Sequence, residues 1–226
     1  SILPNLQHPG PASTRRFLTE WHGQPRPDYG LPPAEIGRSV PAPLRDFYEL
    51  AGEWPNVLVQ NMLAAPDELE QIDGLLVFYI ENQGVYAWAT ELEGMDPPVL
   101  GAWDLNSAEW LPEEEPLSRF LLQVVLFEAA FGAPEGAAAA WLSPSAREEL
   151  VSRLVPLPLG AWRWPDYPTR FYARDDVVAV ICPNRAPDSS DFVSVTVGAR
   201  NAEALEFLED IVGPSWEYYS PRDGSI

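Results

Sequence analysis

Side chains that commonly carry out chemistry are scarce in this chain of 226 residues. It contains no lysine, so a Schiff base or a phosphate-binding lysine is impossible. The two histidines, His8 and His22, both lie near the N-terminus, and Cys182 is the single cysteine. A zinc site of Cys and His ligands cannot be assembled from this set, and a nucleophile paired with histidine would need one of these two. We therefore expect a protein that is not an enzyme and has no cofactor and no metal.

Carboxylates are the abundant reactive groups. The chain has 34 acidic and 14 basic residues, which gives a formal charge of −20. This balance argues against binding to a nucleic-acid backbone or to an anionic membrane surface. It favours a basic protein as partner, although acidity that serves only solubility is the alternative interpretation.

Three places along the chain are candidates for a partner-binding surface. They are the run of three glutamates, the loops that flank an expected central hairpin, and an aromatic cluster in the second half. Each also has a structural interpretation, as a helix start, as turn formers and as core packing respectively. The candidate residues are Asp73, Glu81, Asn82, Glu113, Glu114, Glu115, Trp162, Trp164 and Tyr167.

The first half of the chain predicts helices around an antiparallel hairpin. Apolar spacing indicates helices over 13–23 and 43–52, joined by a proline-rich connector. The runs 75–80 and 85–89 flank a turn that contains Gly84, which is typical of a hairpin. Further strands are expected at 99–103 and 109–111. The glutamate run should then open a largely apolar helix over about 116–131, interrupted by Gln123 and Glu128.

The second half predicts a similar mixture of elements. Ser143 should cap a helix, the runs 169–173 and 177–182 should pair as a hairpin, and 192–197 alternates like a strand. Asn201 should cap a last helix that ends at Gly213. One face of that helix is acidic, with Glu203, Glu206, Glu209 and Asp210.

Three segments of the first half resemble the SMI1/KNR4-like family, also called the SUKH superfamily. They are Pro43–Gly52 with Trp54-Pro55, the hairpin Gly74–Trp88, and the helix start Pro116–Leu122. The resemblance covers roughly residues 35–132. It implies an α+β fold with an antiparallel or mixed sheet and packed helices. We expect this domain at 1–133, with a proline-rich N-terminal segment. The rest, 134–226, would be a C-terminal α+β extension, either a divergent repeat or part of the same core.

The resemblance also implies a function. Bacterial members of the family are commonly immunity proteins that bind and neutralise a toxin, often a nuclease, and no catalytic residues are carried over. We therefore expect an acidic protein-binding module that occludes a basic toxin. The alternatives are a regulatory or scaffold protein with another partner, and a small-ligand or carbohydrate binder that uses aromatic residues. The single cysteine and the absence of a signal-like N-terminal segment favour the cytoplasm.

Overall fold

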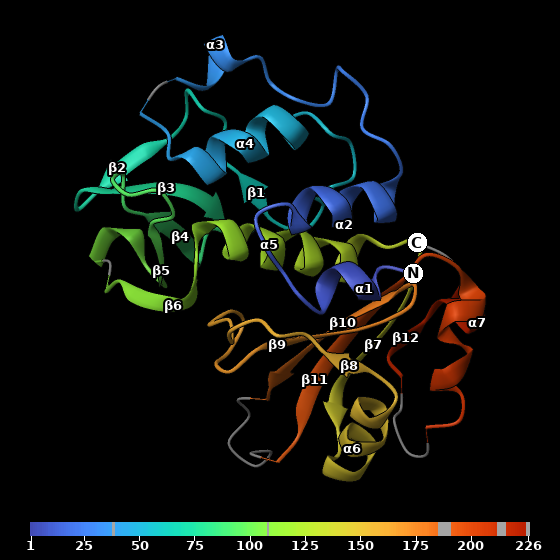
Figure 1. Ribbon diagram of the computed structural model, residues 1–226. Coiled ribbons are helices and arrows are strands. Elements are labelled where there is room, and N and C mark those ends of the chain that lie inside the picture. The colour runs from blue at the N-terminus through green and yellow to red at the C-terminus, as the bar shows by residue number, and fades with distance from the viewer. Residues whose placement is uncertain (38, 108, 185–190, 212–215, 225–226) are drawn as a thin grey trace. The chain divides into compact units, whose positions relative to one another are not determined.

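The computed structural model describes residues 1–37, 39–107, 109–184, 191–211 and 216–224. The chain divides into two compact units. We call Gly10–Glu128 the N-terminal unit, and Ser1–Pro9 together with Ala129–Ile226 the C-terminal unit. Each unit contains one antiparallel sheet with helices, so the predicted α+β fold class is confirmed (Figure 1).

The sheet of the N-terminal unit has the strand order β1-β3-β4-β5-β6, and β2 also pairs with β3. Its strands are β1 (Met62–Leu63), β2 (Glu70–Ile72), β3 (Leu75–Ile80), β4 (Ala87–Thr90), β5 (Pro98–Ala102) and β6 (Leu111–Pro116). Its helices are α2 (Ser13–His22), α3 (Pro33–Ile36), α4 (Ala42–Ala51), the 3-10 turn η1 (Leu105–Ser107) and most of α5 (Leu117–Gly132). The expected hairpin is confirmed as β3 and β4, and the proline-rich connector also contains the short helix α3.

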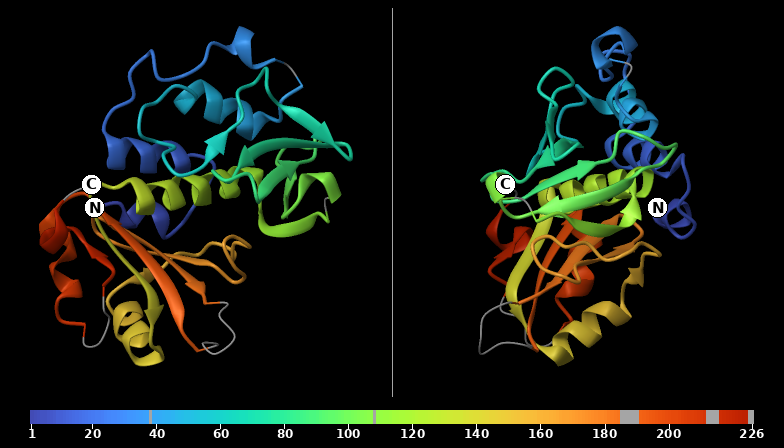
Figure 2. Two further views of the ribbon diagram at one scale, coloured as in Figure 1. Left: turned by 180° about the vertical axis from the view of Figure 1, so that it is seen from behind. Right: turned by 90° about the vertical axis from the view of Figure 1, so that its left-hand side faces the viewer.

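Helix α5 runs along one face of this sheet (Figures 1 and 2). The register of β3 against β4 shifts between Val77 and Tyr79, as at a β-bulge. As a result two consecutive aromatic side chains reach α5. The ring of Phe78 packs edge-on against Phe120 at 5.9 Å, and the Tyr79 hydroxyl donates to Glu128. The opposite face is covered by a smaller apolar cluster around Val77.

The glutamate run does not open a helix, as the sequence predicted, but forms the edge strand β6. Alternation along the strand turns Glu113 and Glu115 inward, each 8% exposed, and leaves Glu114 exposed. Glu113 accepts a hydrogen bond of 3.0 Å from the Trp88 indole, and Glu115 pairs with Arg119 of α5 at 2.7 Å. Buried charges on an edge strand oppose pairing with the edge of another sheet. The helix α5 begins only after the run, at Leu117.

The C-terminal unit has the strand order β12-β7-β11-β10-β9-β8. Its strands are β7 (Glu135–Leu142), β8 (Val155–Pro156), β9 (Arg170–Arg174), β10 (Val177–Pro183), β11 (Val193–Ala199) and β12 (Tyr218–Tyr219). Its helices are α1 (Leu3–Leu6), α6 (Pro144–Ser152), α7 (Ser220–Asp223) and the 3-10 helix η2 (Ala202–Leu208). The alanine- and glycine-rich stretch at the expected domain boundary forms β7, the strand beside β11.

Both predicted caps are present in this unit. The Ser143 hydroxyl accepts from the backbone N–H of Ala146, and the Asn201 side chain accepts from that of Ala204. The segment after Asn201 is a 3-10 helix, although the spacing of its apolar residues predicted an α-helix. Its expected end at Gly213 lies outside the described residues. Along the described ranges, no helix has the length and apolar character that crossing a bilayer requires.

We predict that Glu113→Ala destabilises the protein through Trp88. The variant removes the acceptor of a buried indole N–H, which should lower the free energy of unfolding by about 1–3 kcal/mol. Chemical denaturation monitored by tryptophan fluorescence measures this change. Glu109→Ala, which removes an exposed glutamate two residues before the same strand, is the control and should stay within about 0.5 kcal/mol of wild type. Equal effects of the two substitutions would contradict the inward placement of Glu113.

Candidate functional site: anchored loops and two grooves

A buried carboxylate organises one end of the N-terminal sheet. Glu128 of α5 is 1% exposed, and four hydrogen-bond donors surround it. Its Oε2 accepts from the backbone N–H groups of Val59 and Gln60, each at 2.6 Å. Its Oε1 accepts from the N–H of Asn61 at 3.0 Å and from the Tyr79 hydroxyl at 2.5 Å. The desolvation of a buried charge is costly, so this donor set is what allows the residue to lie there.

The Glu128 carboxylate also fixes two surface loops. Asn61 donates to the Tyr79 hydroxyl, and its side-chain oxygen accepts from the N–H of Asn82 in the turn after β3. Three apolar side chains remain exposed here, namely Val59 at 47% and Val85 at 41% on the loops, and Met62 at 53% at the start of β1. The loops are therefore held in place from beneath while they present apolar side chains to solvent, which lowers the entropy cost of any contact they make.

Burial raises the pKa of Glu128 above its ordinary value, and the hydrogen bonds from Tyr79 and the loop N–H groups oppose that rise only in part. The pKa of Tyr79 is also raised, first by burial and then by the neighbouring Glu128. Burial shifts both groups toward their neutral forms because their surroundings exclude water. They form a structural pair, since neither is exposed to solvent.

A groove of about 820 Å³ lies on the C-terminal unit, along η2 and the turn between β9 and β10. We call it the acidic groove. Six carboxylates and two guanidinium groups line it, from Asp175, Asp176, Glu203, Glu206, Glu209, Asp210, Arg153 and Arg174. Sequence analysis singled out four of these acids as one helix face, and the structure adds the two aspartates of the turn.

The two arginines of the acidic groove are engaged by the protein itself. Arg153 pairs with Glu149 at 3.1 Å and with Asp210 at 3.2 Å, and the Arg174 guanidinium lies 4.7 Å from the centre of the Phe207 ring. Within the described chain, Glu203 and Glu206 make no ion pair, and both are exposed. The groove therefore carries negative charge that the protein does not neutralise.

The negative charge also affects a neighbouring tyrosine. The Tyr219 hydroxyl donates to Glu209 at 3.1 Å. Burial, that hydrogen bond and the charges of Glu209 and Glu206 together raise the pKa of Tyr219 to about 12. Burial is the largest of these causes, and the two glutamates add to it.

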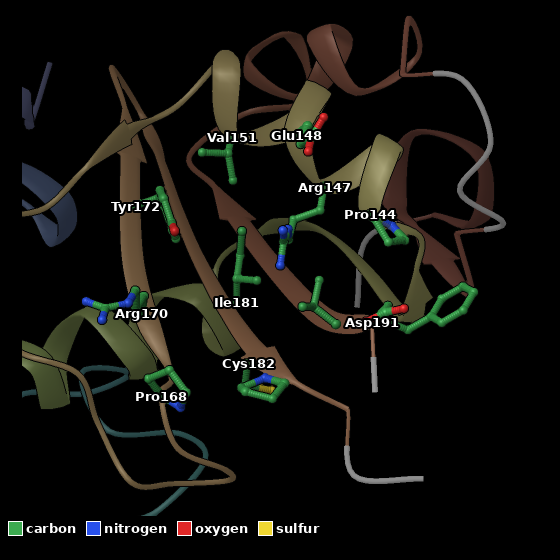
Figure 3. Close-up of a pocket in the computed structure, with 13 residues that line it drawn as sticks. Pro144, Arg147, Glu148, Val151, Pro168, Arg170, Tyr172, Ile181, Cys182 and Asp191 are labelled. Carbon is green, nitrogen blue, oxygen red and sulfur yellow. The ribbon is translucent and has the colours of Figure 1, made fainter. Parts of the chain in front are cut away.

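A second groove on the C-terminal unit, of about 790 Å³, lies between α6 and the strands β9, β10 and β11 (Figure 3). We call it the α6 groove. Ile181 and Val193 of the apolar core line it, and Val151 of α6 packs against that core. Figure 3 shows Arg147 extending from α6 toward Ile181, with Tyr172 on the neighbouring strand. Cys182 also lines the groove, and burial raises the pKa of its thiol, which disfavours a reactive thiolate.

The predicted loop and glutamate candidates do not form one surface. Asp73 is exposed and accepts from the Trp110 indole at 3.2 Å, and Asn82 is exposed in the anchored turn. Glu81 is buried, and its carboxylate accepts from the N–H of Gln83 at 2.9 Å, as a turn former does. Glu113 and Glu115 are buried at the sheet edge, so only Glu114 of that run faces solvent.

The aromatic candidates are divided between core and surface. Trp162 is fully buried and packs against Phe171 at 5.7 Å. Trp164 is partly buried, and Tyr167 is 46% exposed with the Arg163 guanidinium 5.0 Å from its ring centre. This cluster therefore presents one exposed tyrosine and an adjoining arginine, and Trp162 belongs to the core.

Sequence analysis did not identify Glu128, Arg147 or Tyr172 as candidates. A signal was present for Glu128, because a carboxylate inside an apolar helix must find donors when the helix is buried. Arg147 and Tyr172 gave no such signal, since an arginine in a helix and a tyrosine in a strand are usually part of a solvated or packed face.

Comparisons with known proteins add no relative. No family model, no curated protein and no solved structure matches this chain. Among the described residues, no three His, Cys, Asp or Glu side chains are grouped so that they could hold a metal ion. The candidate sites therefore have to be interpreted from their own geometry.

We predict that Glu128→Ala lowers the free energy of unfolding by about 3 kcal/mol, because several donors lose their acceptor at a cost of roughly 1–3 kcal/mol each when they stay buried. Denaturant unfolding measures the change. Glu93→Ala removes an exposed glutamate of the same unit and should have an effect below about 0.5 kcal/mol. A Glu128→Ala variant as stable as Glu93→Ala would show that the carboxylate does not anchor the loops.

The pH dependence of Glu128 has a definite sign. Its pKa in the folded state is raised above the ordinary value of 4.5. At a pH between the ordinary and the raised pKa, the folded chain therefore holds a proton that the unfolded chain releases. The stability that Glu128 contributes is therefore complete below its ordinary pKa and is lost as the pH rises through the raised value. The difference in unfolding free energy between wild type and Glu128→Gln should fall as the pH rises from about 4.5. A difference that grows with pH would contradict the raised pKa.

Proposed function

We propose that this protein is a non-enzymatic binding module that holds a basic protein partner on the acidic groove. The observation that carries the proposal is the unneutralised charge of that groove. Its arginines are engaged by Asp210, Glu149 and the Phe207 ring, while Glu203 and Glu206 face solvent without an ion pair among the described residues. A basic surface would supply the missing counter-charges.

The charge of the whole chain also supports a basic partner. A formal charge of −20 accelerates the approach of a basic protein, and the groove localises the attraction. Charges at a rim mainly increase the association rate, so a tight complex also needs apolar anchors.

The more specific form of the proposal is neutralisation of a toxin in the cytoplasm. The resemblance of residues 35–132 to the SMI1/KNR4-like family supports it, because bacterial members of that family are commonly immunity proteins. A nuclease toxin binds its phosphate-backbone substrate with basic residues, and an acidic protein seated on them blocks the substrate. The inhibition would therefore be steric and electrostatic and would need no chemistry from this chain.

Salt dependence of association tests the electrostatic part. The immobilised protein should retain a dominant basic protein from a lysate of its host at low salt and release it at about 0.5 M salt, where charges are screened within a few ångströms. With the purified partner, Glu203→Gln/Glu206→Gln should slow association by about tenfold, as loss of rim charges does. Surface plasmon resonance measures the association rates of the wild type and of the double variant.

The control is Asp67→Asn/Glu68→Gln, which removes the same charge from exposed positions of the N-terminal unit and should change the rate far less. Equal slowing in both double variants, or association that is independent of salt, would refute the role of the acidic groove. The toxin proposal requires in addition that the captured partner be toxic or enzymatically active and lose that property in the complex. Several weak partners without inhibition would indicate a scaffold instead.

A further inference from the structure

The α6 groove has a floor that is suited to an apolar group. Ile181 pairs with Val195 on one side and Arg170 on the other, so alternation places Ile181, Val193 and Tyr172 on the strand face beneath α6. Val151 of α6 packs against the same core from the helix side. The volume of about 790 Å³ lies within the range of roughly 300–1,000 Å³ that is typical of small-molecule sites.

Two side chains that line the groove, Arg147 of α6 and Tyr172 of β9, carry hydrogen-bond donors that have no partner among the described residues. The guanidinium of Arg147 makes no ion pair or hydrogen bond within the described part of the chain, although the protein has 34 acidic residues. The Tyr172 hydroxyl likewise has no hydrogen-bond partner among the described residues. Figure 3 shows Ile181 between these two side chains, so an apolar body on Ile181 would lie within reach of both.

The acids of the α6 groove do not neutralise Arg147. Glu148 and Asp191 also line the groove and are exposed, but neither forms a salt bridge with it. Arg170 also lines the groove, but Figure 3 shows its guanidinium directed away from Arg147. A guanidinium and a phenol that both donate are the combination that holds a carboxylate or sulfonate, because such an acid group accepts several hydrogen bonds at once.

We propose that the α6 groove binds a small organic anion with an aromatic or branched apolar body. The acid group accepts from Arg147 and from the Tyr172 hydroxyl, and the apolar body covers Ile181, Val151 and Val193. This site is independent of the acidic groove, which attracts the opposite charge. The protein as a whole repels anions, so selective binding of one requires a local arrangement of this kind.

A matched pair of fluorescent probes tests the proposal at about 0.15 M salt. 8-Anilinonaphthalene-1-sulfonate carries an anion on an aromatic body, and N-phenyl-1-naphthylamine has the same body without the sulfonate. The sulfonate probe should bind the full chain saturably with one site, at least tenfold more tightly than the neutral probe. Arg147→Gln should weaken the sulfonate probe by about tenfold and leave the neutral probe unchanged, and Tyr172→Phe should weaken it less.

The control variant is Arg15→Gln. Arg15 is an exposed arginine that lines a different hollow, of about 460 Å³, in the N-terminal unit. It should leave the affinity of the sulfonate probe unchanged, and thermal unfolding checks that each variant is folded. The proposal is overturned if the two probes bind equally, if the sulfonate probe does not saturate, or if Arg15→Gln weakens it as much as Arg147→Gln does.

Discussion

The N-terminal unit depends on a single buried carboxylate. Helix α5 is apolar nearly all round and must be buried, yet it carries Glu128 into the interior. The charge is tolerated only because three consecutive backbone N–H groups and the Tyr79 hydroxyl converge on it. That requirement determines the path of residues 59–61 and, through Asn61, the turn after β3. One side chain thus ties a helix, a strand and two loops together.

The acidity of the chain serves two different purposes. Several carboxylates are structural, since Glu81 builds a turn, Glu113 holds the Trp88 indole and Glu128 anchors the loops. These charges are satisfied inside the protein and cannot attract a partner. The carboxylates of the acidic groove remain exposed, and its arginines are already engaged. The net charge therefore overstates how many carboxylates are available to a partner. The available negative charge is concentrated in the acidic groove.

Local patterns predicted most elements correctly and failed where tertiary contacts decide. The hairpin of β3 and β4 and the caps at Ser143 and Asn201 follow from turn and capping residues, and they are confirmed. The glutamates before α5 matched a helix start, but pairing with β5 makes them a strand. The candidate sites were harder to predict. The acidic groove combines η2 with a turn about 25 residues earlier in sequence. Arg147 and the β10 residue Ile181 line the same groove, although they are distant in sequence.

Amide hydrogen exchange of the protein, free and saturated with its captured basic partner, tests the central claim most directly. If the acidic groove is the binding face, exchange should slow in the turn around Asp175 and across Asn201–Asp210 when the partner is bound. Slower exchange confined to the N-terminal unit, with both of these segments unchanged, would contradict the assignment of the partner to the groove.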